Sequence, residues 1–171
     1  MNLKSLYKHI GLLIGTAFFV GSTQAVLYTF SDPIDGLQEV PPNASPGSGT
    51  AFGTYDSSTM TLSIGTSASG LLGPVTAAHI HGPAVPGVSA GVVFPLSGAT
   101  GSTSYSSADV FVLTPTHEAA FLGGLWYVNI HSSVFPGGEI RGQLHPVPVP
   151  EPGTMVALLL GAGIAARRRR K

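Results

Sequence analysis

Hydrophobic and polar residues alternate along two short segments near the end of the chain, 127–132 and 139–144. Phe-Pro-Gly-Gly at 135–138 separates the segments, and this composition favours a turn. Because side chains on a strand point alternately to opposite faces, the pattern predicts a β-hairpin with one hydrophobic face and one polar face. The hydrophobic face comprises Val128, Ile130, Ile140 and Leu144, and the polar face comprises Asn129, His131, Glu139, Arg141 and Gln143. The hydrophobic face is expected to pack against the core.

The region that precedes this hairpin consists of short strand-forming segments separated by Gly, Pro, Asp and Ser. The chain has 23 Gly and 14 Pro among 171 residues, which favours an all-β sandwich or barrel. One short helix is expected at 115–122, because Thr114 is a suitable N-cap, Pro115 suits the first turn and Gly123 follows the last residue. Strands are expected at 26–30, 49–55, 60–66, 75–81, 92–96, 102–106, 110–113, 125–132 and 139–144.

The first 25 residues have the three-part composition of a secretory signal peptide. Lys4 and Lys8 precede an apolar segment at 10–20, and small or polar residues follow up to Ala25. The apolar segment is shorter than the ~20 residues needed to span a membrane. We therefore expect export and cleavage after Ala25.

The last part of the chain combines a proline-rich segment, an apolar segment and a basic end. The repeated prolines after Leu144 favour an extended linker rather than a strand. Twelve apolar residues at 155–166 precede the basic cluster at 167–171, which is expected to stay on the cytoplasmic side of the membrane. A helix of that length measures about 18 Å, short of a ~30 Å hydrocarbon core. Flanking residues and snorkelling arginines would complete the span.

Between residues 26 and 150 the charge is strongly acidic. Arg141 is the one basic residue against seven acidic residues, a formal charge of −6. No basic stripe is present to neutralise phosphates, so nucleic acid is excluded as a partner. The chain has no cysteine, so disulfides and thiol chemistry are excluded as well, and stability must come from packing.

Three histidines are candidate metal ligands. His79 and His81 are two residues apart on an expected strand and therefore share one face, a spacing found in many metal sites. His131 lies on the polar face of the hairpin and supplies a third imidazole, and Glu139 is a candidate fourth ligand or a group that orients one of the rings. Imidazole nitrogens suit copper or zinc.

An alternative interpretation gives these residues a structural role without a cofactor. The histidines and Asn129 would then hydrogen-bond to backbone carbonyl groups, and Glu139 would pair with Arg141. The sequence leaves both interpretations open and favours the structural one, without a cofactor, because every buried polar group needs a hydrogen-bond partner whereas metal binding is occasional.

Three motifs, in order, resemble those of the CHRD domain, a family named after chordin and found in many exported bacterial proteins. They are Leu-Gln-Glu-Val-Pro-Pro at 37–42, Ala-His-Ile-His-Gly-Pro-Ala at 78–84, and the hairpin at 127–144. The resemblance implies an antiparallel immunoglobulin-like or superoxide-dismutase-like β-sandwich. In the dismutase fold an H-x-H strand contributes copper ligands. This chain has no dense zinc-binding histidine loop and no cysteines, so dismutase activity is not expected.

The C-terminal segment resembles the PEP-CTERM sorting signal of Gram-negative bacteria. The resemblance rests on Val149, Pro150, Glu151 and Pro152, the hydrophobic segment and the terminal arginines. It implies partners in the secretion machinery and an exosortase, with a transient inner-membrane intermediate. The final location would be the cell surface, the periplasm or the extracellular matrix, where extracellular polysaccharide or envelope components are candidate partners.

These features together predict four segments and two competing functions. The segments are a signal peptide at 1–25, a CHRD-type β-sandwich at 26–146, a linker with the PEP motif at 147–153, and a hydrophobic segment with a basic tail at 154–171. The leading hypothesis is an exported, non-enzymatic protein with a binding or structural domain. The alternative is a metal-dependent redox or hydrolytic enzyme that uses His79, His81 and His131. The two differ in whether the imidazoles converge around an open coordination position.

Overall fold

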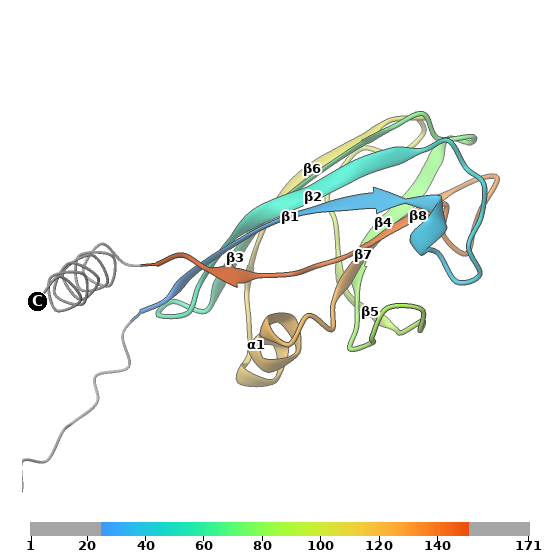
Figure 1. Cartoon of the computed structure of the whole chain (residues 1–171). Helices are drawn as coiled ribbons and strands as arrows, with labels where there is room; N and C mark the ends of the chain where they lie inside the picture. Colours follow the sequence, from blue (N-terminus) through green and yellow to red (C-terminus); the bar gives the residue numbers. More distant parts are fainter. Residues whose placement is uncertain (1–24, 151–171) are drawn as a thin grey trace, which may run out of the picture.

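The computed structural model describes residues 25–150, which form one curved β-sheet with a short helix at one end (Figure 1). The predicted signal peptide, the hydrophobic segment and the basic tail lie outside the described residues. The elements are β1 (Leu27–Asp35), the 3-10 helix η1 (Gly36–Gln38), β2 (Ser48–Asp56), β3 (Thr61–Ser69), β4 (Val75–His81), β5 (Val92–Pro95), β6 (Tyr105–Val112), α1 (Pro115–Leu122), β7 (Tyr127–Ser132), β8 (Ile140–Gln143) and β9 (Val147–Pro148).

The strands are ordered β5-β4-β7-β8-β1-β2-β3-β6, and β9 pairs with β1. The pairs are antiparallel, and the sheet curls so that side chains of its two edge strands, β5 and β6, come into contact. Phe94 on β5 and Phe111 on β6 stack with ring centroids 4.4 Å apart, and the Ser97 N–H donates to the Asp109 carboxylate at 3.1 Å. This closure places two sheet faces against each other, so the all-β, sandwich-like fold predicted from the sequence is confirmed.

The core fills the space inside the curl with side chains from alternate positions of the strands. On β3, for example, Leu62 and Ile64 are buried, while the alternate residues Thr61, Ser63 and Gly65 are partly exposed. At the end near α1, Phe121 packs against Tyr55, with ring centroids 5.5 Å apart, and against Trp126 at the same distance. Helix α1 therefore closes one end of the core, and its N-cap is Thr114, as predicted.

Several predicted strand bounds differ from the structure: β3 extends to Ser69 rather than ending at residue 66, and β7 begins at Tyr127 rather than at residue 125. Three further differences change how strands pair. Strand β1 continues past Phe30 to Asp35, because its whole length pairs with β2. One strand, β6, replaces the two predicted at 102–106 and 110–113, since Asp109 continues the ladder with β3. The expected linker is wrong at Val147–Pro148, which pairs with β1 as strand β9. Proline is tolerated there because the strand lies off the main path of the sheet and needs few ladder hydrogen bonds.

The predicted hairpin is present. Strands β7 and β8 pair antiparallel, with Asn129 opposite Arg141 and Ile130 opposite Ile140. The four residues of the predicted hydrophobic face are fully buried: Val128, Ile130, Ile140 and Leu144. The other face points away from the core and carries the side chains described in the next section.

Replacement of Ile130 by Asp is expected to lower the free energy of unfolding by roughly 3–5 kcal/mol, because it places an unpaired charge in the core. Ser133→Asp is the matched control, since Ser133 lies in the exposed loop of the same hairpin. Urea titration of the two purified variants measures the difference. Equal midpoints for the two variants would contradict the burial of this face.

Candidate metal centre

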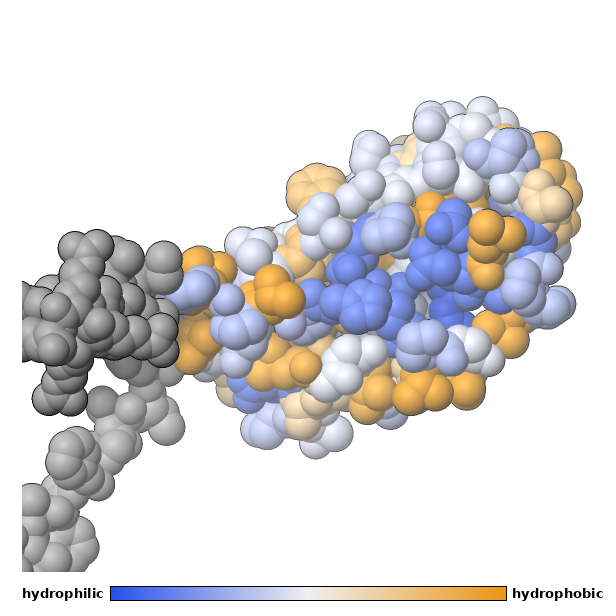
Figure 2. All heavy atoms as spheres, in the orientation of Figure 1, coloured by the Kyte–Doolittle hydropathy of each residue, from blue (hydrophilic) through white to orange (hydrophobic). Residues whose placement is uncertain are grey.

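The outer face of β4 and β7 brings the three predicted histidines together. His79 and His81 lie on β4, and His131 lies on β7 opposite Ala77. One ring nitrogen from each residue can be chosen so that all three lie within 4.8 Å of one another. The shortest of the imidazole contacts joins His79 Nδ1 and His131 Nε2 at 3.2 Å. Figure 2 shows hydrophilic side chains gathered over the region where β4, β7 and β8 lie in Figure 1.

Backbone carbonyl groups fix the orientation of two of the rings. His81 Nδ1 lies 2.9 Å from the carbonyl oxygen of Ala90, and His131 Nδ1 lies 2.9 Å from that of Pro136. A carbonyl oxygen only accepts hydrogen bonds, so each Nδ1 carries the proton and each neutral ring keeps its lone pair on Nε2. Nε2 of His81 is buried and has no hydrogen-bond partner among the described residues. Metal-binding histidines in proteins are held in this way, with the second nitrogen donating to a carbonyl or carboxylate.

The surroundings keep two of the rings neutral. Burial lowers the pKa of His79, and the nearby His131 and His81 lower it further. Burial also lowers the pKa of His81; the hydrogen bond to Ala90 opposes this effect, whereas His131 and Arg141 add to it. The lone pairs of both rings are therefore available at neutral pH without the removal of a proton.

Tyr127 supports the cluster from the position on β7 that pairs with His81 on β4. Its ring stacks on His81, with centroids 5.1 Å apart and an interplanar angle of 10°. Its hydroxyl accepts from the Ala90 N–H at 2.9 Å and lies 3.3 Å from the Ala90 carbonyl oxygen. Tyr127 therefore holds both the His81 ring and the backbone group that orients this ring. Sequence reasoning missed this role and the two carbonyl groups, because a backbone carbonyl leaves no signal in residue identities.

Glu139 does not take part in the cluster, so its prediction as a metal ligand or as a partner of Arg141 is wrong. Its carboxylate is fully buried: Oε1 accepts from the Ser45 hydroxyl and from the Leu72 N–H, each at 2.6 Å, and Oε2 has no hydrogen-bond partner among the described residues. In residues 25–150 the one contact within 4.0 Å between a carboxylate and a basic side chain joins Asp32 to His145, so Glu139 and Arg141 form no ion pair. Glu139 precedes β8 and follows Gly138, whose φ of 136° breaks the alternation on which the prediction relied.

The interpretation that these residues have a structural role is confirmed in part. His81 and His131 do hydrogen-bond to backbone carbonyl groups, but Asn129 Oδ1 is buried without a partner in the described part of the chain. The two interpretations use different nitrogens of the rings. The bond at Nδ1 leaves Nε2 of His81 free for a ligand, whereas Nε2 of His131 accepts from His79 Nδ1 at 3.2 Å and would give up that bond to a metal ion.

Comparison with models of known protein families identifies the family of this chain. A family model for the CHRD domain matches residues 30–144. The chain belongs to the CHRD domain family. The match runs from β1 to the end of the β7–β8 hairpin, and it confirms the resemblance drawn from the three motifs. The CHRD domain is not a known enzyme family.

A second family model, for the PEP-CTERM protein-sorting motif, matches residues 148–171. The two matches together describe an exported CHRD protein that exosortase-type machinery sorts in the envelope of a Gram-negative bacterium. No curated protein and no solved structure matches the chain. Within residues 25–150, no helix is long and apolar enough to cross a membrane.

Replacement of Glu139 by Gln is expected to lower the free energy of unfolding at pH 7 by about 2–3 kcal/mol, because the acceptor of a buried network loses its charge and the new amide group adds donors where a carboxylate oxygen was. Burial raises the pKa of Glu139, but hydrogen bonds from Ser132, Ser45 and the amides of Leu72 and Gly73 outweigh this effect, and the pKa lies below its usual 4.5. The carboxylate therefore stabilises the fold above about pH 4.5, and this contribution is lost as the pH falls through the lower folded-state value.

Urea titrations at pH 7 and at pH 3 test the role of Glu139. The difference between the wild-type protein and Glu139→Gln should shrink at the lower pH. Glu118→Gln is the control, because Glu118 is only partly buried and its replacement can still accept from the Tyr55 hydroxyl. A difference between wild type and Glu139→Gln that does not change with pH would contradict the pKa assigned to Glu139.

Proposed function

We propose that this protein is a non-enzymatic component of the cell envelope or extracellular matrix, and that its CHRD domain binds a transition-metal ion through His79, His81 and His131. The observation that carries the proposal is the buried Nε2 of His81, which has no partner among the described residues and lies in a cluster of three imidazoles. A buried polar atom without a hydrogen bond costs free energy, and a metal ion at the centre of the cluster would offset that cost.

The distances in the cluster suit a metal ion. Zinc–nitrogen bonds of about 2.0–2.1 Å in a tetrahedral site place neighbouring ligand atoms about 3.3 Å apart. The candidate ligand atoms lie within 4.8 Å of one another. His79 Nδ1 and His131 Nε2, which share a hydrogen bond at 3.2 Å, would both bind the ion once the proton on His79 Nδ1 moves to Nε2. Small rotations of the rings would complete the geometry. A set of imidazoles without a carboxylate favours copper or zinc over magnesium, calcium or manganese.

A metal-dependent enzyme is the second candidate function. Three protein ligands leave a fourth position for water or a substrate, as in catalytic zinc sites. His79 and His131 are only partly buried, so solvent reaches this side of the cluster. The displacement of Glu139 favours the binding role, because the cluster then has no carboxylate in the described residues to act as a general base on metal-bound water.

Metal titration by calorimetry, on protein purified without an affinity tag, tests the proposed site. Zinc or copper(II) is expected to bind with a stoichiometry of one at pH 7. His81→Ala is expected to weaken binding by at least about tenfold, because even the loss of a residue that only hydrogen-bonds to a metal ligand typically lowers metal affinity 10–100-fold. His145→Ala is the matched control, because His145 bonds to Asp32 outside the cluster. Equal affinities for the two variants would leave the three histidines as structural groups.

The predicted cleavage sites define the mature protein. Removal of the segment through Ala25 and cleavage near Pro150, Glu151 and Pro152 would leave a protein that starts at Val26 and ends near Pro152. The intact mass of the protein isolated from its native host measures both ends. Retention of residues 167–171 in the mature pool would instead indicate that the hydrophobic segment is a lasting anchor.

A further inference from the structure

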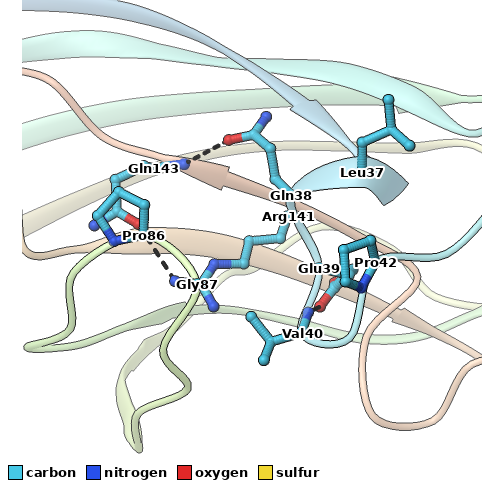
Figure 3. A pocket seen from close by; sticks show the side chains of 9 residues that line it. All are labelled: Leu37, Gln38, Glu39, Val40, Pro42, Pro86, Gly87, Arg141 and Gln143. Carbon is cyan, nitrogen blue, oxygen red and sulfur yellow. Dashed lines mark hydrogen bonds between the residues drawn. The ribbon is translucent and has the colours of Figure 1, made fainter.

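A second candidate site lies beside the metal centre, where segment 37–42 and the loop after β4 meet strand β8 (Figure 3). The cavity there has a volume of about 300 Å³. Its lining residues are Leu37, Gln38, Glu39, Val40, Pro42, Pro86, Gly87, Arg141 and Gln143. The side chains of Leu37 and Val40 are exposed and contribute to an apolar rim, so the cavity combines a charged interior with an opening that suits an organic molecule.

Arg141 supplies the positive charge of this cavity. The residue is 2% exposed, and it is the one basic residue between positions 26 and 150. Its guanidinium carbon lies 3.4 Å from the centroid of the Tyr127 ring, and its Nη2 donates to Gln143 Oε1 at 3.3 Å. No carboxylate lies within 4.0 Å of it in the described part of the chain. A guanidinium has five N–H groups, so a buried cation faces the cavity with most of its donors unused.

The carboxamides that line the cavity are occupied by the protein itself. Gln143 Nε2 donates to the carbonyl oxygens of Ala84 and Gly124, and Gln38 Nε2 donates to the carbonyl oxygen of Pro33 and to Asp35. Recognition of a ligand in this cavity therefore falls to the two ionisable side chains, Arg141 and Glu39.

Glu39 faces the same cavity but forms no ion pair with Arg141 within 4.0 Å. It is 7% exposed, its Oε1 has no hydrogen-bond partner among residues 25–150, and its Oε2 accepts only a long bond of 3.4 Å from the Val40 N–H. Figure 3 shows Arg141 entering from β8 and Glu39 from the segment after η1. A ligand group that lies between them would contact both.

We propose that this cavity binds a small organic carboxylate, whose charge is held by the guanidinium of Arg141. A planar carboxylate matches the planar fork of a guanidinium and can accept two parallel hydrogen bonds. It would supply the counter-ion that the buried Arg141 lacks within the described residues, and it would remove the cost of burying that charge alone. The apolar rim would contact the organic part of the ligand.

Glu39 makes the binding dependent on pH. Burial raises the pKa of Glu39 to about 6, against the opposing effects of the Val40 N–H and the Arg141 charge. Below this pH Glu39 is neutral and does not repel an anion, whereas above it the negative charge of Glu39 opposes binding. Carboxylate affinity is therefore expected to rise as the pH falls through about 6.

The groups that face Glu39 separate its titration from that of the histidines. Arg141 faces it from β8 and stays protonated. A Cβ on Gly138 would lie 2.5 Å from Glu39 Oε1 and 2.6 Å from the Asn129 amide, so the neighbours from β7 and its loop are an uncharged side chain and backbone. The other titratable groups near the cavity are His79, His81 and His131, Tyr127 against the guanidinium of Arg141, and Asp35. Asp35 lies opposite Arg141 on β1, and its carboxylate accepts from the Leu37 and Gln38 N–H groups and from Gln38 Nε2. Substitution of Glu39 alone isolates its contribution from theirs.

The test is a titration of the full-length, metal-free protein with benzoate, followed by the backbone amide signals of Val40 and Gly87 in NMR spectra at pH 5.5 and pH 7.5. Removal of metal makes the result independent of the proposed metal site. Wild-type protein is expected to bind benzoate at pH 5.5 and at least about fivefold more weakly at pH 7.5, since each pKa unit of coupling corresponds to tenfold in affinity. Benzamide, which has the same shape without the charge, is not expected to bind.

The decisive variant is Glu39→Gln, which mimics the neutral side chain. It is expected to bind benzoate at pH 7.5 as tightly as the wild-type protein does at pH 5.5, and Glu118→Gln is expected to bind like the wild type. Arg141→Lys should weaken binding by at least about tenfold, because a point charge replaces the fork. The Glu39→Gln variant keeps the proposal testable even if Arg141→Lys fails to fold, because its expected gain of affinity is measured in a separate protein.

Several results would overturn the proposal. These are no benzoate binding at either pH by the wild type and Glu39→Gln, weaker binding in Glu39→Gln than in the wild type, and equal binding of benzamide. Binding of inorganic phosphate without binding of benzoate would also overturn it, because the site would then recognise any small anion rather than an organic carboxylate.

Discussion

The buried carboxylate of Glu139 is the constraint on which the candidate sites depend. It accepts from Ser45 before β2 and from Leu72 before β4, while its backbone carbonyl accepts from the Asn43 side chain at 3.0 Å. Three segments that are distant in sequence therefore meet where the β7–β8 hairpin turns. Their meeting fixes the register that places His131 beside the histidines of β4 and Arg141 beside Asn129. A charge with several donors can have this role because an unpaired carboxylate in the interior would cost far more than the network gains.

The two faces of the β7–β8 hairpin have different roles: the inner face packs in the core, and the outer face carries the side chains of the candidate sites. The inner face is fully buried and hydrophobic, so most of the apolar burial that holds the strands comes from this face rather than from the outer one. Tyr127 connects the two candidate sites on that outer face, because it stacks on His81 and also contacts the guanidinium of Arg141. Groups on paired strands keep their separation more closely than groups on loops do, which suits both a metal centre and an anion site.

Local signals predicted local structure well. Strand β4 and helix α1 have the predicted bounds, since the helix carries its own cap and the strand ends at a Gly-Pro pair. The meeting of His79 and His81 with His131 followed from two alternating segments that share a sheet. Glu139 could not be placed in this way, because alternation ends where Gly138 leaves the extended conformation. The carbonyl groups of Ala90 and Pro136, and the lack of an ion partner for Arg141 in the described residues, depend on loop positions that residue identities do not encode.

The pairing of β9 with β1 has a consequence for processing at the membrane. The N–H of Val149 donates to the carbonyl oxygen of Leu27 at 2.8 Å, so the chain enters and leaves the domain at one end of the sheet (Figure 1). The PEP motif begins where β9 ends, and the expected signal-peptide cut lies just before β1. Two cuts made at these places would remove no strand from the sheet. The domain could then fold completely while both ends are still attached to the bilayer, and its release would need no unfolding.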